Sequence, residues 1–67
     1  MRILLNNREE IIEAEQLTMN ELIQLKRFTF RLLVTKVNDR LVKREDRDQI
    51  LVKDGDKVEI MHLISGG

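Results

Sequence analysis

The last two residues of the chain, Gly66-Gly67, are those whose type and place could support chemistry. Glycine makes up about 7% of residues on average, so two terminal glycines arise by chance in about 0.5% of chains. A leader without side chains lets a partner's backbone close around it, because no Cβ blocks the approach. A frayed terminus and a cloning remnant are the plainer interpretations, and both stay open at this point.

The chemistry that such a tail supports is activation of its own carboxylate. A free carboxylate is a poor electrophile, but adenylation by ATP would convert it into a mixed anhydride that a sulfur nucleophile attacks to give a thiocarboxylate. The chain cannot perform the activation, because its only glycines are Gly55, Gly66 and Gly67, and no phosphate-binding glycine loop can be assembled from them. A separate activating enzyme would be required.

Length and composition exclude several other functions. The 67 residues predict one domain over 1–67 with a flexible tail over 65–67, too small to enclose a ligand pocket, so we expect no enzyme. Twelve basic residues balance twelve acidic ones and only two are aromatic, which argues against nucleic acid. The chain has no cysteine, no metal-site pattern, and no apolar run that suits a signal peptide or membrane span, which predicts the cytoplasm.

The order of the expected elements predicts the fold class. Asn6-Asn7 suits the turn of a hairpin between strands over 1–6 and 8–14. Thr18 and Glu21 fit a capping box that begins a helix over about 19–26. Strands are then expected over 31–38, 41–42 and 57–64, with a turn at Asn38-Asp39 and residues 50–52 leading into a turn around Gly55. We therefore predict an α+β fold of the β-grasp (ubiquitin-like) type, with a mixed sheet of four to five strands and one main helix.

Strand alternation predicts which side chains face outward. If the sheet residues Ile3, Leu5, Val37, Val58 and Ile60 face the helix, then four apolar residues point the other way: Leu4, Val34, Met61 and Leu63. We interpret these four as a partner-docking surface on the open face of the sheet, next to the tail. The alternative is that they are scattered exposed apolar residues of no consequence. The single histidine, His62, is interpreted as an ordinary strand residue.

The ordered set of these pieces resembles the ThiS/MoaD-like sulfur-carrier family, and within it the thiamine-biosynthesis branch. The pieces are residues 3–7 (ILLNN), 18–23 (TMNELI), 37–38 with 41–44 (VN, LVKR), 54–60 (DGDKVEI) and the final Gly66-Gly67. The similarity covers essentially the whole chain. It departs from the family pattern after Arg44, where members often carry a large aromatic and this chain has Glu45-Asp46-Arg47.

The resemblance implies a sulfur carrier that binds no cofactor and has no catalytic residue. Gly67 would be the residue converted to an adenylate and then a thiocarboxylate, with Ser65 and Gly66 threading the tail into partner enzymes. Those partners would be an E1-like adenylyltransferase that uses ATP, a cysteine desulfurase route that supplies sulfur, and thiazole synthase. Three alternatives remain: the small subunit of molybdopterin synthase, a ubiquitin-like protein modifier, and a plain β-grasp interaction module.

Overall fold

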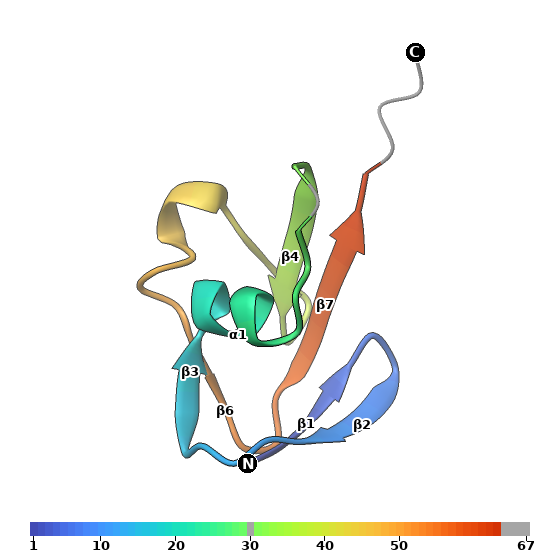
Figure 1. Cartoon of the computed structure of the whole chain (residues 1–67), viewed down its shortest axis with the longest axis vertical. Helices are drawn as coiled ribbons and strands as arrows, with labels where there is room; N and C mark the ends of the chain where they lie inside the picture. Colours follow the sequence, from blue (N-terminus) through green and yellow to red (C-terminus); the bar gives the residue numbers. More distant parts are fainter. Residues whose placement is uncertain (30, 64–67) are drawn as a thin grey trace.

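A computed structural model describes residues 1–29 and 31–63, which form one α-helix, one 3₁₀ turn and two β-sheets (Figure 1). The elements in chain order are β1 (Arg2–Leu5), β2 (Arg8–Ile11), β3 (Gln16–Thr18), α1 (Met19–Leu25), β4 (Leu33–Val37), β5 (Arg40–Val42), the 3₁₀ turn η1 (Arg44–Asp46), β6 (Leu51–Lys53) and β7 (Lys57–His62). Within the described residues, no helix is long and apolar enough to cross a membrane.

The main sheet has five strands in the order β2-β1-β7-β4-β5, so β7 is its central strand. The pair β1 and β7 is parallel, whereas the pairs β1–β2, β4–β7 and β4–β5 are antiparallel. The prediction of a mixed sheet with one main helix is therefore confirmed. A second sheet of two antiparallel strands, β3 and β6, was not predicted; it pairs Leu17 with the fully buried Val52.

Paired residues with positive φ close the two hairpins of the main sheet. Asn6 and Asn7 have φ of 50° and 65°, and Asn38 and Asp39 have φ of 50° and 68°. Two consecutive positive φ angles are typical of the type I′ turn, whose twist matches that of the flanking strands, and asparagine and aspartate tolerate them better than other side chains. Both turns lie where the sequence predicts them.

The helix begins at the predicted capping box. The Glu21 amide donates to Thr18 Oγ1 at 3.1 Å, and the Thr18 amide donates to Glu21 Oε1 at 2.9 Å. The helix ends at Leu25, one residue before the predicted end, and Lys26 is its C-cap. The Lys26 ammonium reaches Glu10 on β2 at 3.0 Å, which ties the end of the helix to the first hairpin.

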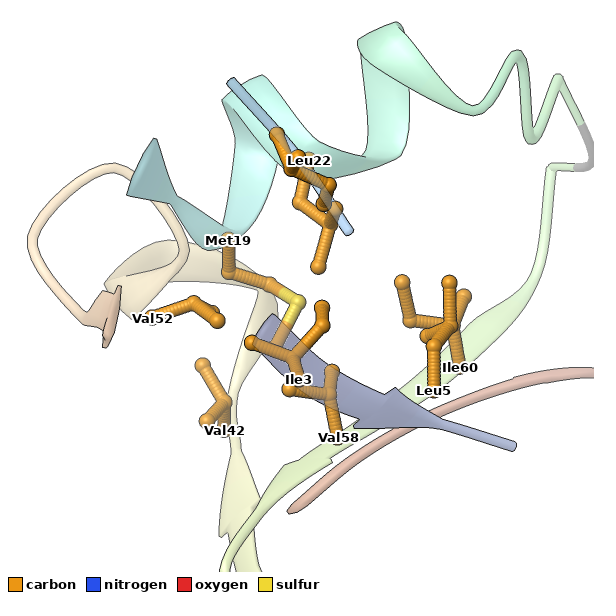
Figure 2. Close-up of a cluster of buried hydrophobic side chains, with 9 residues drawn as sticks. Ile3, Leu5, Met19, Leu22, Val42, Val52, Val58 and Ile60 are labelled. Carbon is orange, nitrogen blue, oxygen red and sulfur yellow. The ribbon is translucent and has the colours of Figure 1, made fainter. Parts of the chain in front are cut away.

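The hydrophobic core fills the space between α1 and one face of the main sheet (Figure 2). Met19 and Leu22 of the helix are fully buried. The buried apolar residues are Ile3, Leu5, Ile12, Met19, Leu22, Val42, Val52, Val58 and Ile60. Four of the five sheet residues expected to face the helix are in this set, and the fifth, Val37, is partly buried against it. The predicted phase of the strands is correct.

Candidate functional site

The strand β7 is the element that leads into the tail. It begins at the end of the molecule where the N-terminus lies and runs toward the opposite end (Figure 1). Ser65, Gly66 and Gly67, on which the predicted chemistry depends, lie outside the described residues. The described part of the site is therefore β7 itself, together with the contacts that fix its direction and the surface around its C-terminal half.

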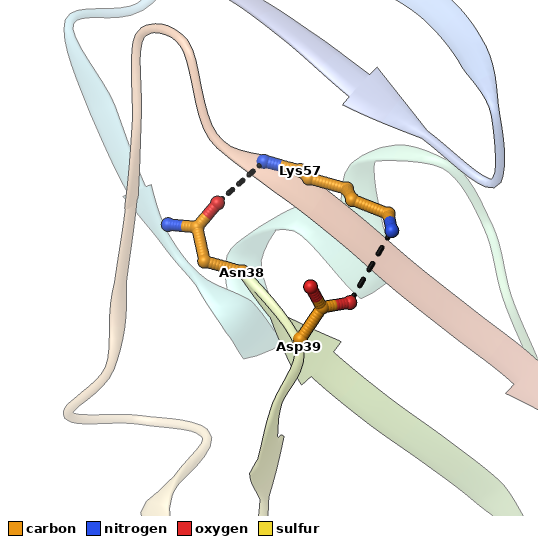
Figure 3. Close-up of polar contacts among 3 residues, drawn as sticks. All are labelled: Asn38, Asp39 and Lys57. Carbon is orange, nitrogen blue, oxygen red and sulfur yellow. Dashed lines mark hydrogen bonds and ion pairs between the residues drawn. The ribbon is translucent and has the colours of Figure 1, made fainter.

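The start of β7 is held by the turn between β4 and β5 (Figure 3). The Lys57 amide donates to Asn38 Oδ1 at 2.9 Å, and the Asn38 amide donates to the Lys57 carbonyl at 2.7 Å. The Lys57 ammonium also lies 3.2 Å from Asp39 Oδ1, in an exposed ion pair that contributes little to stability. The two Asn38 hydrogen bonds fix the register in which β7 enters the sheet.

The middle of β7 is held by the side chain of Asn6, which lies just beyond β1. The Ile60 amide donates to Asn6 Oδ1 at 2.9 Å, and Asn6 Nδ2 donates to the Ile60 carbonyl at 3.0 Å. The Asn6 backbone amide donates to the Val58 carbonyl at 2.9 Å. The side-chain amide thus takes the place of a further strand residue and extends the pairing of β1 with β7 toward the tail.

We expect Asn6→Ala to lower the free energy of unfolding by about 2–3 kcal/mol in a urea titration. The change removes two hydrogen bonds of about 1 kcal/mol each and places alanine at a positive φ, which costs about 1 kcal/mol more. Asn7→Ala is the matched control, because Asn7 shares the turn and its side chain makes no hydrogen bond within the described residues. Equal losses in the two variants would refute this role for the Asn6 amide.

Three of the four predicted docking residues lie together on the face of the sheet opposite the helix. Val34 on β4 is directly opposite Met61 on β7, and Leu63 follows two residues later on the same face. The Leu63 amide donates to the Leu32 carbonyl at 3.0 Å, which brings Leu32 opposite Leu63. Met61, Leu63 and Leu32 are 43%, 51% and 50% exposed. We call Leu32, Val34, Met61 and Leu63 the outer cluster.

Leu32 was missed at the sequence level, although a signal was available. It lies two positions before Val34, so strand alternation assigns both residues to one face, but it precedes the part of β4 with regular strand pairing. Leu41 is also exposed on this face, at 61%, opposite Lys36. Neither residue was among the predicted docking residues.

Leu4, the fourth predicted docking residue, is exposed but lies apart from the other three. It is opposite Lys57, the first residue of β7, whereas Met61 lies four residues further along that strand. Four residues of extended strand span about 13 Å, and the outward side chains of Lys57 and Glu59 lie between. The prediction placed all four residues next to the tail; the register brings only Val34, Met61 and Leu63 together, at the C-terminal end of β7.

Residues 1–29 and 31–63 do not assemble a candidate metal site. They contain no group of three or more histidine, cysteine, aspartate or glutamate residues that could hold a metal ion. His62 is exposed on β7, opposite Leu33, in agreement with its interpretation as an ordinary strand residue. The described part offers a central strand that leads toward the tail, beside an exposed apolar surface.

Comparisons with known proteins agree over the full length of the chain. The model of the ThiS family matches residues 1–67. A crystal structure of a thiamine biosynthesis protein (ThiS) from Geobacter metallireducens superposes with a TM-score of 0.90 at 29% identity, covering 100% of both chains. An NMR structure of a thiamine biosynthesis protein from that organism gives a TM-score of 0.82 at 29% identity, covering 100% of this chain and 88% of the other. The search of curated proteins found no match.

Proposed function

Because this chain belongs to the ThiS family, we propose that Gly67 is the residue on which it carries sulfur. The protein is a sulfur carrier for thiamine biosynthesis and not a catalyst; it binds no cofactor of its own, and its partners belong to that pathway. The observation that supports Gly67 is the pair Gly66-Gly67, which follows the central strand β7 by a few residues in a chain that the family model matches over 1–67. Of the carrier pathways that the sequence left open, the family match supports thiamine.

The proposed cycle begins with an E1-like adenylyltransferase. An oxygen of the Gly67 carboxylate attacks the α-phosphorus of ATP, and pyrophosphate leaves. Hydrosulfide then attacks the acyl carbon and AMP leaves, which gives the thiocarboxylate directly. A persulfide from a cysteine desulfurase route instead gives an acyl disulfide as AMP leaves, and two thiols reduce this disulfide to the thiocarboxylate while they are oxidised to a disulfide. The product is a thiocarboxylate, whose sulfur thiazole synthase consumes. Ser65 and Gly66 thread the tail into both enzymes, because small residues let a channel close around the backbone. The cycle uses ATP, so we assign it to the cytoplasm.

The proposed docking surface for the adenylyltransferase is the outer cluster. It lies at the C-terminal end of β7, where the last residue pairs between β4 and β7 are Leu33–His62 and Val34–Met61. Exposed apolar side chains that gather on one face are typical of surfaces that a partner covers. Leu4 is part of the docking surface if the partner extends along β7 over Lys57 and Glu59, because these two residues lie between Leu4 and the outer cluster.

The test of the proposed function is the mass of the intact protein. After incubation with a cognate E1-like enzyme, ATP and sulfide, we expect the mass to rise by the difference between one sulfur and one oxygen. Fragmentation should place the change on Gly67, and omission of ATP should prevent it, because the free carboxylate is not attacked. An unchanged mass with several activating enzymes of thiamine biosynthesis would contradict the proposal.

A further inference from the structure

A hollow of about 530 Å³ lies between α1, the segment that follows it, and the turn η1. Its apolar lining comes from Ile23, Phe28 and Leu33, which are partly buried against the core. Its charged lining comes mainly from three arginines, Arg31, Arg44 and Arg47. We call this hollow the arginine groove. Nothing in the carrier chemistry above uses it.

The guanidinium of Arg47 is fixed in place by neutral acceptors alone. Its Nε donates to Thr35 Oγ1 at 3.2 Å, and its Nη2 donates to the Leu33 carbonyl at 2.6 Å. Thr35 is fully buried and donates in turn to the Val42 carbonyl at 2.7 Å. Arginine carries five N–H donors, so three remain for another group. The side chain is thus oriented in advance of any ligand, and its charge is not neutralised by these contacts.

The arginines that line the groove form no ion pair within the described residues. The ion pairs among the described residues join Arg2 to Glu9, Lys26 to Glu10 and Lys57 to Asp39, and none includes an arginine of the groove. The one acidic lining residue is Asp48, whose carboxylate accepts from Asn20 Nδ2 at 2.6 Å. Three positive charges against one negative charge leave the lining at +2. A lining with this net charge favours the binding of a negatively charged group from another molecule.

We propose that the arginine groove binds an acidic segment of a partner protein, with a carboxylate against the guanidiniums and a neighbouring apolar side chain on Ile23, Phe28 and Leu33. Guanidinium forks match the two oxygens of a carboxylate or a phosphate equally well. The apolar lining distinguishes a peptide carboxylate from a free phosphate, because a peptide also buries the apolar side chains whereas an inorganic anion leaves them exposed to water. The acidic segment is therefore the occupant that uses both parts of the lining.

The place of the groove indicates which partner supplies the segment. Leu33 is directly opposite His62, the last residue of β7, so the groove lies at the tail end of the sheet. Strand alternation puts Leu33 on the helix side and Val34 on the outer side. An enzyme that covers the outer cluster and inserts an acidic segment into the groove would hold β7 from both faces. The identity of this enzyme as the adenylyltransferase rests on the proposed function; the preference of the groove for acidic peptide does not.

The first test is a binding titration on the full chain, in which binding is monitored through the amide chemical shifts of the protein. The probes are an acetylated eight-residue peptide of alternating glutamate and leucine, its glutamine counterpart, and inorganic phosphate. We expect the acidic peptide to shift the amides of Phe28, Arg44 and Arg47, and the glutamine peptide to bind at least about tenfold more weakly. Equal binding of the two peptides, no shift with either, or tighter binding of phosphate at the same amides would overturn the proposal.

The second test compares Arg44→Glu with Lys43→Glu. Both residues are exposed neighbours and both variants change the net charge equally, but only Arg44 lines the groove. Arg44→Glu should weaken binding of the acidic peptide at least about tenfold and raise KM for adenylation, with kcat unchanged. Lys43→Glu should change the peptide affinity and the KM by less than about twofold each. Equal effects of the two substitutions would contradict the proposal that the arginine groove binds the acidic segment. Weaker peptide binding with an unchanged KM would overturn the adenylyltransferase as occupant, and failure of the wild type to be activated would contradict the proposed function alone.

Discussion

Deletion of Gly67 is expected to abolish adenylation while leaving the melting temperature almost unchanged. The deletion shortens the tail by one residue, about 3.3–3.6 Å of extended chain. Displacement of a reacting group by 1 Å can cost about 100-fold in rate, so the loss should be at least that large. Stability should persist because every buried apolar residue of the described core lies between Ile3 and Ile60. The measurements are pyrophosphate release with a cognate adenylyltransferase and thermal unfolding by circular dichroism.

Competition provides the control for the deletion. The shortened protein keeps β7 and the outer cluster, so it should inhibit activation of the full-length carrier with an affinity close to the wild-type KM. A variant that neither reacts nor competes would show that the tail is required for docking rather than for chemistry. Adenylation of the shortened protein at the normal rate would end the assignment of Gly67 as the residue that carries sulfur.

Met61→Asp is expected to slow activation at least about tenfold at low carrier concentration. Met61 is 43% exposed and lies opposite Val34, so the substitution changes the centre of the outer cluster. A partner that covers this face would bury the new carboxylate without a counter-charge, which costs several kcal/mol of binding free energy. Stability should fall by no more than about 1 kcal/mol, because the side chain is outside the core. Steady-state adenylation and urea unfolding measure the two effects.

Ile11→Asp is the matched control for Met61→Asp. Ile11 is 71% exposed on β2, an edge strand of the same sheet, and the substitution again converts an exposed apolar strand residue into aspartate. It should activate at close to the normal rate. Equal slowing by both variants would contradict a localised docking surface, and Leu4→Asp would then measure how far along β7 the covered area extends.

The features that sequence analysis predicted are those coded locally. The capping box of Thr18 and Glu21 and the turns at Asn6-Asn7 and Asn38-Asp39 need only a few neighbouring residues, and each lies where it was expected. Strand alternation also assigned the buried and exposed faces of β1 and β7 correctly. From these pieces and the order of the elements, the β-grasp arrangement followed without knowledge of any long-range contact.

The features that were missed depend on pairing between distant segments. The sheet of β3 and β6 joins residues about 35 positions apart through strands of three residues, too short for a periodic signal. Leu4 was grouped with Met61 because alternation gives the face of a side chain but not its position along the sheet, which the parallel register of β1 and β7 decides. The arginine groove likewise needs Arg31 to be brought beside Arg44 and Arg47 by the fold.

The central position of β7 has a consequence for protein synthesis. It is the last strand of the sheet to leave the ribosome, yet β1 and β4 both pair with it, so the main sheet cannot assemble until residues 57–62 have been made. Chains that terminate before residue 57 lack the central strand as well as the tail. The dependence runs one way: under the proposed function, a chain that carries Gly66-Gly67 always contains the central strand, whereas a chain that ends between residues 62 and 66 could fold without being a substrate.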